Sequence, residues 1–507
     1  MTRMHWFWGI LGVTVALFLH LDTIPLYDVD EGAFTEATRE MLVSGNFLTT
    51  YLDGELRFDK PILIYWLQAA SISLFGLTEA AARLPSVLAA LGWAGLTYAF
   101  GRRHYGAEAG FWAALFLTLS LQVSLIAKAA IADALLNLWI AAALFAIYQY
   151  RVSADRRLLL GAYAAMGLGM LTKGPVAVVI PFAATFLFYA SFGQWREWLR
   201  GVFHFPGWAV FLVIAGPWYA LEFAAQGQAF IDGFFLKHNV SRFQGPMEGH
   251  AGSLLYFVPV LLLGTLPFTG LILRGLAPLR TLWADELARF LLLWFAFVFV
   301  FFSLSGTKLP HYIIYGYTPL FLLAARAITL GGAPRFRGLW AAAFLLFLAA
   351  LPALLARLEP TGLDAYGRAL LAALSAQLGT GWSLAMGAAA VLMVGIGYLA
   401  HWRTAVLASG LLMALVFHGA VLPLTGQIKQ GPVREAGRLA RAADAPIHLK
   451  MGAPSFLFYA RRTSVDRPMQ PGDWFFTKAE KATKYPPHRP ILQKHGMLLA
   501  EVVENAR

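Results

Sequence analysis

Long apolar runs separated by short polar connections dominate the first 423 residues of the chain. A transmembrane helix needs about 20 predominantly apolar residues, and thirteen runs, some of them short, fit this pattern. They lie at roughly 6–21, 85–101, 107–125, 132–150, 158–172, 174–190, 207–221, 254–273, 287–303, 311–327, 338–355, 383–400 and 404–422. Between 158 and 190, one re-entrant pair is an alternative to two spans. The pattern predicts an all-α polytopic membrane protein with about 13 transmembrane helices.

Arginine residues in the connections predict the orientation of these spans. With the N-terminus on the inner side, every predicted inner loop contains at least one arginine, as the positive-inside rule requires. These arginines are Arg102, Arg103, Arg151, Arg156, Arg157, Arg196, Arg200, Arg274, Arg280, Arg335, Arg337 and Arg403. An odd number of spans then places the C-terminus on the outer side, which is the periplasm for a bacterial inner membrane.

The pattern changes in residues 424–507, where polar and apolar residues mix. Residues 433–443 have helical spacing, and the short apolar runs 447–449, 456–459 and 498–503 are typical of strands. We therefore expect a transmembrane domain over 1–423, followed by a small soluble α/β domain over 424–507 in the periplasm.

Composition supports the membrane assignment and limits the possible ligands. Hydrophobic residues make up 59% of the chain and charged residues 13%, about half the charged fraction that is usual in soluble domains. The net charge of +12 is spread over many short loops, which favours membrane orientation over nucleic-acid binding. The chain has no cysteine, so any metal must be bound by histidine and carboxylate side chains. The sequence predicts no oligomeric state.

The first outer loop, residues 22–84, is the most acidic part of the chain. It contains ten of the 28 acidic residues and is far longer than a connection requires. Asp28, Asp30 and Glu31 follow the first apolar run directly. They could act as a base, bind a divalent metal or orient a sugar, and the alternative is that they are ordinary solvated acids. Later in the loop, Phe58-Asp59-Lys60-Pro61 precedes an apolar, aromatic stretch that suits a juxtamembrane amphipathic helix.

Lysine, histidine and arginine side chains recur at the other predicted outer ends. Lys60 would lie at the depth of the lipid headgroups, where its ammonium could bind a lipid phosphate. The alternative is that its side chain simply extends toward water. Asp133 lies at a span end and indicates a site or a partner, with Lys128 as the simplest partner. Lys173 lies in a tight turn that is chiefly a helix-breaking signal. His238 and Arg242 are four residues apart and share a face if helical, and Lys308 and Tyr312 could contact phosphate.

On this topology all these groups lie on the outer side of the membrane. Carboxylates and phosphate-binding cations gathered at one face suggest chemistry on a lipid phosphate. A transporter of polyprenyl-linked sugar is the alternative, but it would place ionisable groups near the middle of the bilayer, often in broken helices.

Several motifs occur in a characteristic order. Asp30-Glu31 follows the first span, and then come Phe-Asp-Lys-Pro-x-x-x-Tyr-Trp (58–66), Ala-Ala-Arg-Leu-Pro-Ser (81–86), Leu-Thr-Lys-Gly-Pro (171–175) and Ser-Gly-Thr-Lys-Leu-Pro-His-Tyr (305–312). In these motifs the chain resembles the lipid A aminoarabinose transferase family. That family belongs to the GT-C membrane glycosyltransferases, together with the protein O-mannosyltransferases. The resemblance covers about residues 1–330.

The resemblance implies transfer of a sugar from a polyprenyl phosphate carrier to an acceptor on the outer side. In the aminoarabinose enzymes the donor is undecaprenyl-phosphate aminoarabinose and the acceptor is a lipid A phosphate. A different GT-C activity, which would move mannose, galacturonate or another sugar to a glycan, lipid or protein, is the first alternative. A flippase of polyprenyl-linked sugar is the second.

The resemblance also implies roles for individual residues. Asp30 matches the catalytic aspartate of the first loop, with Glu31 as a neighbour and Asp133 as a second polar residue of the site. Lys60, Arg242, Lys308 and Tyr312 would bind the carrier phosphate. Asp59 and His238 fall where a bound metal such as Zn²⁺ would lie if the reaction uses one. Asp59 replaces the usual glutamate and His311 replaces a smaller polar residue, so the sugar and the acceptor stay open.

Overall fold

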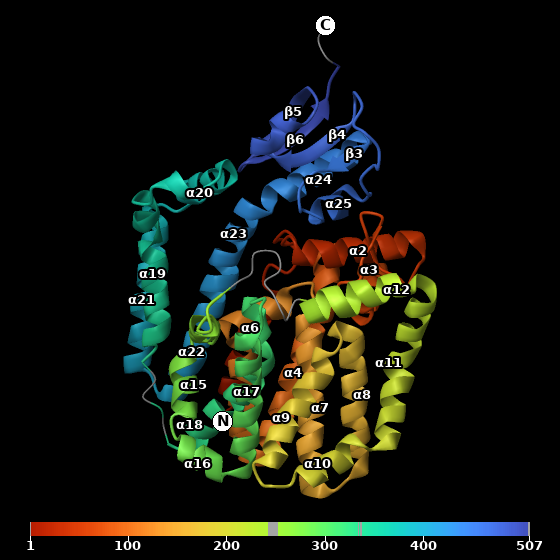
Figure 1. Ribbon diagram of the computed structural model, residues 1–507. Coiled ribbons are helices and arrows are strands. Elements are labelled where there is room, and N and C mark those ends of the chain that lie inside the picture. Colours follow the sequence, from red (N-terminus) through yellow and green to blue (C-terminus); the bar gives the residue numbers. More distant parts are fainter. Residues whose placement is uncertain (1, 242–251, 333, 335–336, 505–507) are drawn as a thin grey trace.

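Apolar helices form a bundle that carries a small mixed domain over one end (Figure 1). This computed structural model describes residues 2–241, 252–332, 334 and 337–504. The helices of the bundle are α1 (Arg3–Phe18), α4 (Glu79–Tyr105), α5 (Ala107–Leu119), α6 (Leu121–Lys128), α7 (Asp133–Ser153), α8 (Arg156–Lys173), α9 (Val176–Ala190), α11 (Phe205–Gln226), α14 (Phe257–Gly264), α15 (Thr269–Leu276), α17 (Glu286–Leu304), α18 (Tyr317–Leu330), α19 (Leu339–Ala356), α21 (Thr380–Leu399) and α22 (Trp402–Val416). The predicted fold class, a polytopic helical membrane protein with a small C-terminal α/β unit, is confirmed.

The predicted number of spans is not confirmed. Within the described residues, eight helices are long and apolar enough to cross a membrane, or up to ten if the bent pairs α5–α6 and α14–α15 each form one span. The thirteen predicted runs all coincide with helices, but some are too short for the bilayer. For example, α1 has 16 residues and α9 has 15, fewer than the roughly 20 that cross the hydrocarbon core. A turn at Gly174, whose φ of +87° suits glycine, separates α8 from α9.

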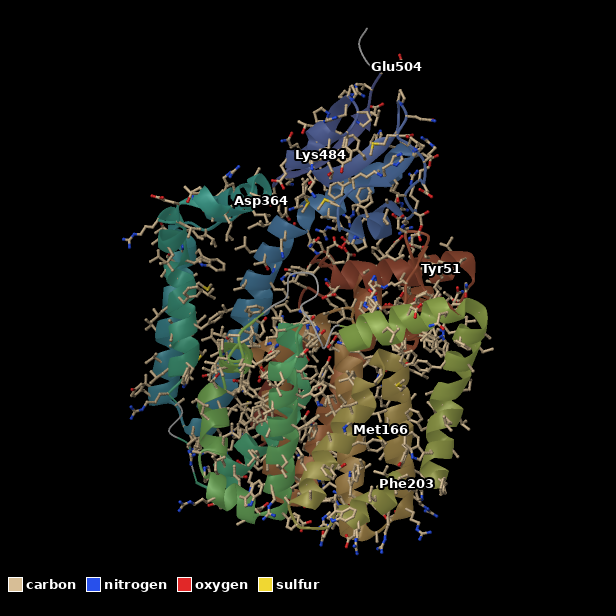
Figure 2. The ribbon with its side chains drawn as sticks, in the orientation of Figure 1. Tyr51, Met166, Phe203, Asp364, Lys484 and Glu504 are labelled. Carbon is tan, nitrogen blue, oxygen red and sulfur yellow. The ribbon has the colours of Figure 1, made fainter. Side chains whose placement is uncertain are left out.

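Side chains on the outside of the bundle are largely apolar, as a lipid environment requires. On α11, for example, Leu212 and Val213 are 58% and 74% exposed. Figure 2 shows Phe203 at the end of the bundle opposite Tyr51 and Lys484. The short helix α10 (Trp195–Val202) lies at the same end as Phe203.

A layer of helices lies between the bundle and the C-terminal domain (Figure 1). Its members are α2 (Asp30–Ser44), the hairpin β1 (Tyr51–Leu52) and β2 (Glu55–Leu56), α3 (Leu63–Phe75), α12 (Gln228–Phe230) and the π-helix η1 (Ile231–Ser241). The first outer loop therefore forms the predicted juxtamembrane helices. Residues 31–41 of α2 are all buried, because the C-terminal domain covers the face that points away from the bundle.

The C-terminal domain contains a four-stranded sheet in the order β3-β4-β6-β5. Its strands are β3 (Ile447–Leu449), β4 (Trp474–Lys478), β5 (His488–Lys494) and β6 (Met497–Val502). β3 and β4 are parallel, whereas β6 pairs antiparallel with β4 and β5. The helix α24 (Gly431–Ala443) confirms the helical prediction, and α23 (Leu422–Lys429) leads from the bundle into the domain. A second contact with the domain comes from α20 (Ala365–Gln377), whose N-cap residue is Asp364 (Figure 2). The Asp364 carboxylate lies 3.4 Å from the ammonium of Lys478 in β4.

One predicted strand is wrong. Residues 456–459 lie in the helix α25 (Ser455–Ala460), not in a strand. Every residue of α25 is buried. A short apolar run that is buried on all sides shows no hydrophobic periodicity, so its sequence does not distinguish a helix from a strand. The helix packs against α2 and α24, so tertiary contacts decide its conformation.

Candidate active site

Asp30 is the first residue of α2, and its side chain is exposed. An acidic residue in the first turn of a helix interacts favourably with the positive end of the helix dipole. Asp30 lines a cavity of about 290 Å³ at the end of the bundle that carries the C-terminal domain. The other residues that line it are His20, Ile24, Tyr27, Asp28, Glu31, Arg83, Leu125, Ile126, Lys128, Ala129, Ile131, His311 and Leu422. The most exposed acid of the predicted motif therefore faces an open space.

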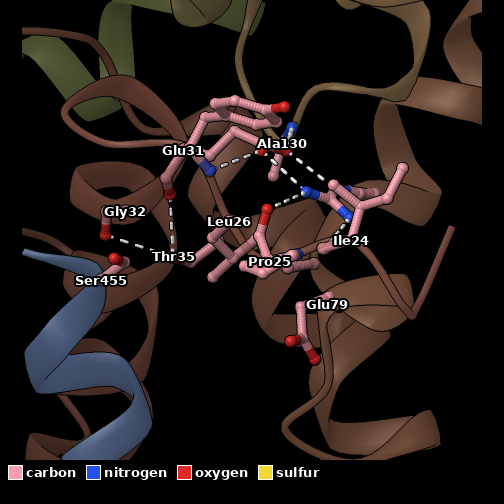
Figure 3. Close-up of polar contacts among 12 residues, drawn as sticks. Ile24, Pro25, Leu26, Glu31, Gly32, Thr35, Glu79, Ala130 and Ser455 are labelled. Atoms are coloured by element: carbon pink, nitrogen blue, oxygen red, sulfur yellow. Dashed lines mark hydrogen bonds and ion pairs between the residues drawn. The ribbon is translucent and has the colours of Figure 1, made fainter. Parts of the chain in front are cut away.

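Glu31, the adjacent acid, instead has hydrogen-bond partners for both of its carboxylate oxygens. Its carboxylate accepts two hydrogen bonds from the Arg83 guanidinium, each 2.8 Å long. The backbone N–H groups of Tyr27 and Ala130 donate two more, at 2.9 and 2.8 Å (Figure 3). Burial alone would raise the pKa of Glu31, but the charge and hydrogen bonds of Arg83 hold that pKa below its usual value. The structure thus places Glu31 where it anchors the start of α2.

Asp28 is turned toward the C-terminal domain. Its carboxylate accepts hydrogen bonds from the backbone N–H of Ser455, at 2.9 Å, and from the Ser455 hydroxyl. Burial raises the pKa of Asp28 to about 7, although these hydrogen bonds act in the opposite direction. The three acids of the motif therefore have three different environments: Asp28 contacts the C-terminal domain, Glu31 pairs with Arg83, and Asp30 faces the cavity.

Asp133, at the start of α7, belongs to a second polar cluster. Its Oδ1 accepts hydrogen bonds from Lys173 Nζ at 2.7 Å and from Tyr315 Oη at 2.6 Å. Lys173 also donates to Tyr315 Oη at 2.8 Å, and His311 Nε2 lies 3.9 Å from Asp133 Oδ1. Asp133 is 3% exposed, so its negative charge is balanced inside the protein.

The structure contradicts two expectations about Lys128 and Lys173. Lys128 is not the partner of Asp133, because its ammonium donates to the backbone carbonyl of Leu19. Lys173 is not merely part of a turn, because the end of α8 brings it to the start of α7, where it pairs with Asp133. Sequence distance favoured Lys128, which is five residues from Asp133, but the break between α6 and α7 separates the two side chains.

Asp59 lies in a third cluster, in the segment between β2 and α3. Its carboxylate lies 2.7 Å from His238 Nε2 and 3.0 Å from the Arg57 guanidinium. Burial alone would raise the pKa of Asp59, but the His238 hydrogen bond and the Arg57 charge hold it well below its usual value. Lys60 donates to the Asp59 backbone carbonyl at 2.8 Å, which places its ammonium beside the same cluster.

The described residues do not complete a metal site. Asp59 and His238 lie side by side, but within the described parts of the chain no group of three histidine or acidic residues could hold an ion. The positive Arg57 contacts the same carboxylate, and it would repel a cation there. We therefore assign no step to a metal.

The remaining predicted residues differ in how the structure places them. Lys308 is 7% exposed and its Nζ donates to Ser305 O at 2.8 Å. Tyr312 is also 7% exposed, and its ring lies 5.8 Å from the Lys173 ammonium. Arg242 lies outside the described residues.

His311 links these clusters. The charges of Asp133, Lys173, Asp30 and Lys60 all act on its ring, and Arg57 interacts electrostatically with both Asp59 and Asp30. Groups from five elements therefore converge at one end of the bundle. Arg57 and Tyr315 were not predicted, although Arg57 directly precedes the Phe58-Asp59-Lys60-Pro61 motif and Tyr315 lies three residues beyond Tyr312.

This arrangement defines a class of protein: a multi-pass membrane protein whose ionisable residues gather over one end of a helical bundle. The model of the dolichyl-phosphate-mannose-protein mannosyltransferase family matches residues 59–220. An uncharacterized protein of Aquifex aeolicus is 31% identical over 306 residues, which cover 60% of this chain and 69% of that protein. The undecaprenyl phosphate-alpha-4-amino-4-deoxy-L-arabinose arabinosyl transferase of Shewanella sediminis is 31% identical over 65% of this chain. The match covers 62% of that relative's own length.

Solved structures show the same fold. ArnT from Cupriavidus metallidurans, in a crystal structure bound to undecaprenyl phosphate, superposes with a TM-score of 0.79 at 23% identity and covers 99% of both chains. The apo form of that protein gives the same TM-score. The chain belongs to the aminoarabinose transferase-like family of GT-C membrane glycosyltransferases. Its apolar helices and these relatives indicate a multi-pass protein of the inner membrane.

Proposed function

We propose that this protein transfers a sugar from a polyprenyl phosphate to an acceptor at the periplasmic face of the inner membrane. One observation carries the proposal: the exposed Asp30 faces a cavity that His311 also lines. The charges of Lys60 and Lys173 act on His311, and Arg57 interacts electrostatically with Asp30. An acid beside a group of cations suits a reaction in which a phosphate leaves and an acceptor oxygen attacks.

In this reaction the acceptor oxygen forms a bond to the anomeric carbon of the sugar, and the bond from that carbon to the phosphate oxygen breaks. The leaving phosphate gains negative charge as the bond breaks. Lys60 and Lys173 would stabilise that charge, because cations fixed at the site of developing charge lower the barrier most. Lys173 is held in place by Asp133 and Tyr315, so it needs little reorganisation when the substrate binds.

The donor we favour is undecaprenyl phosphate carrying 4-amino-4-deoxy-L-arabinose, and the acceptor we favour is a lipid A phosphate. Relatives that are named undecaprenyl phosphate-alpha-4-amino-4-deoxy-L-arabinose arabinosyl transferases support the donor. The acceptor determines what Asp30 does. A sugar hydroxyl acceptor needs a general base at neutral pH, whereas a phosphate is already anionic, so Asp30 would then orient it.

The test is transfer by purified protein, with labelled undecaprenyl-phosphate aminoarabinose as donor and lipid A as acceptor. We expect Asp30→Asn to lower turnover about 100-fold or more and Lys60→Ala to weaken both donor binding and turnover. Glu55→Gln is the matched control, because Glu55 is an exposed acid of the same loop and should not matter. If Asp30→Asn and Asp30→Ala had equal residual activity, the amide side chain of the asparagine would not be positioning the acceptor.

Other outcomes separate the alternatives. Unchanged transfer in both Asp30→Asn and Lys60→Ala would refute the site. Transfer to a glycan or protein but not to lipid A, or from a mannose or galacturonate donor, would identify a different GT-C activity. Movement of intact donor across proteoliposomes without consumption would favour a flippase.

A further inference from the structure

Lys128 is a buried cation that has no counter-ion among the residues that the structure describes. The residue is 4% exposed and ends α6. Its ammonium donates to the carbonyl of Leu19, and no described carboxylate lies within ion-pair distance of it. The neighbouring Arg83 adds repulsion. Lysine is almost never fully buried unless it is paired, because removing an ammonium from water is costly.

The position of Lys128 relates it to the active site. The chain leaves α6 through Ala130, whose N–H donates to Glu31 at 2.8 Å and so fixes this turn against the start of α2 (Figure 3). Lys128 and Asp30 line the same cavity of about 290 Å³. Lys128 takes no part in the Asp133–Lys173–Tyr315 cluster or the Asp59–His238 cluster, where the donor phosphate would bind.

The lining of this cavity suggests what it accommodates. Leu125, Ile126 and Leu422 supply apolar walls, and His20 and His311 add polar groups that can donate hydrogen bonds. Its volume exceeds that of several water molecules, so a phosphate group fits. A cation among apolar walls suits an amphipathic molecule with an anionic head.

We propose that Lys128 binds a phosphate of the acceptor, so that this cavity is the acceptor subsite and Lys128 selects anionic acceptors. The inference rests on the proposed function and extends it to the acceptor side. The ammonium would supply the charge-assisted hydrogen bond that holds the attacking phosphate near Asp30, and the bound phosphate would supply the missing counter-ion.

A purely structural role for Lys128 predicts different results. Leu19 is the C-cap residue of α1, and a lysine near a helix C-terminus can satisfy a terminal carbonyl. Lys128→Gln keeps a hydrogen-bond donor but loses the charge, whereas Lys128→Arg keeps the charge. Lys429→Gln, at an exposed lysine of α23, controls for the loss of one positive charge.

In the first experiment, transfer is measured over a range of lipid A concentrations. We expect Lys128→Gln to raise KM for lipid A about 10- to 100-fold, the usual effect of losing a hydrogen bond to a charged group, with KM for the donor unchanged. Lys128→Arg should retain much of the affinity, and Lys429→Gln should behave like the wild type. A wild-type KM for lipid A in Lys128→Gln, or an equal rise in the donor KM, would overturn the proposal.

The second experiment needs no transfer activity, so it separates failure of this inference from failure of the proposed function. The protein is saturated with undecaprenyl phosphate to fill the donor site, and inorganic phosphate is then added while Tm is measured. We expect phosphate to raise Tm of the wild type and of Lys429→Gln but not of Lys128→Gln. No shift in the wild type, or the same shift in all three proteins, would refute the acceptor subsite.

Discussion

At the scale of single residues, neighbouring acids in one short motif have unrelated environments. Asp28 illustrates this, because burial raises its pKa to about 7 while Asp30, two residues later, is exposed. An aspartate in an unfolded chain has a pKa near 3.9. At pH values between these two pKa values, Asp28 is protonated in the folded protein and ionised in the unfolded chain.

This difference predicts how stability depends on pH. Because the folded state binds more protons over this interval, the contribution of Asp28 to the free energy of unfolding falls as pH rises from about 4 to about 7. Asn cannot titrate, so Asp28→Asn should lose that part of the dependence. Thermal unfolding in detergent at pH 5, 6 and 7 measures it. If wild type and variant change in parallel over this range, Asp28 titrates near its ordinary pKa when folded.

At the scale of elements, α2 is held between the bundle and the C-terminal domain. Two aspartates of the first outer loop each accept hydrogen bonds from both the backbone N–H and the hydroxyl of a serine in that domain: Asp28 from Ser455 and Asp53 from Ser464. Since Asp30 begins α2, contacts made by the C-terminal domain help to position the candidate catalytic acid.

Gly32 tests this packing. A Cβ atom there would lie 2.0 Å from Asp28 Oδ1 and 2.6 Å from the Ser455 backbone N, and Figure 3 shows Gly32 beside Ser455. We expect Gly32→Ala to destabilise the protein by about 1–3 kcal/mol or more, the usual cost of overpacking, and to lower transfer. Gly95→Ala is the control, because nothing lies within 4 Å of a Cβ at that helical position, where alanine favours the helix. A similar Tm for Gly32→Ala and wild type would show that α2 does not depend on this close approach.

At the scale of the whole molecule, the candidate site residues that the structure describes lie at the end of the bundle that carries the C-terminal domain, and α10 lies at the other end (Figure 1). The arginine distribution predicts that the site end is periplasmic. Alkaline phosphatase, which is active only in the periplasm, should therefore be active when fused to the C-terminus. Fused within residues 191–194, between α9 and α10, it should be inactive. The reverse pattern would invert the proposed orientation.

The sequence by itself determined the features that local chemistry controls. Apolar run length predicted helices at all thirteen positions, and the ordered motifs predicted the family and brought Asp30, Lys60, Asp133 and His238 into consideration. The number of spans was not determined in this way, because a run of 15 or 16 apolar residues forms a helix whether or not it crosses the bilayer.

Only the tertiary structure decided which charged groups meet. Asp133 pairs with Lys173, 40 residues away, rather than with Lys128, five residues away, and Asp28 meets Ser455 across 427 residues. Local spacing cannot predict such pairs, because they depend on how separate helices pack. The same packing buried Lys128 in the cavity that Asp30 faces, where no carboxylate of the described part of the chain pairs with it.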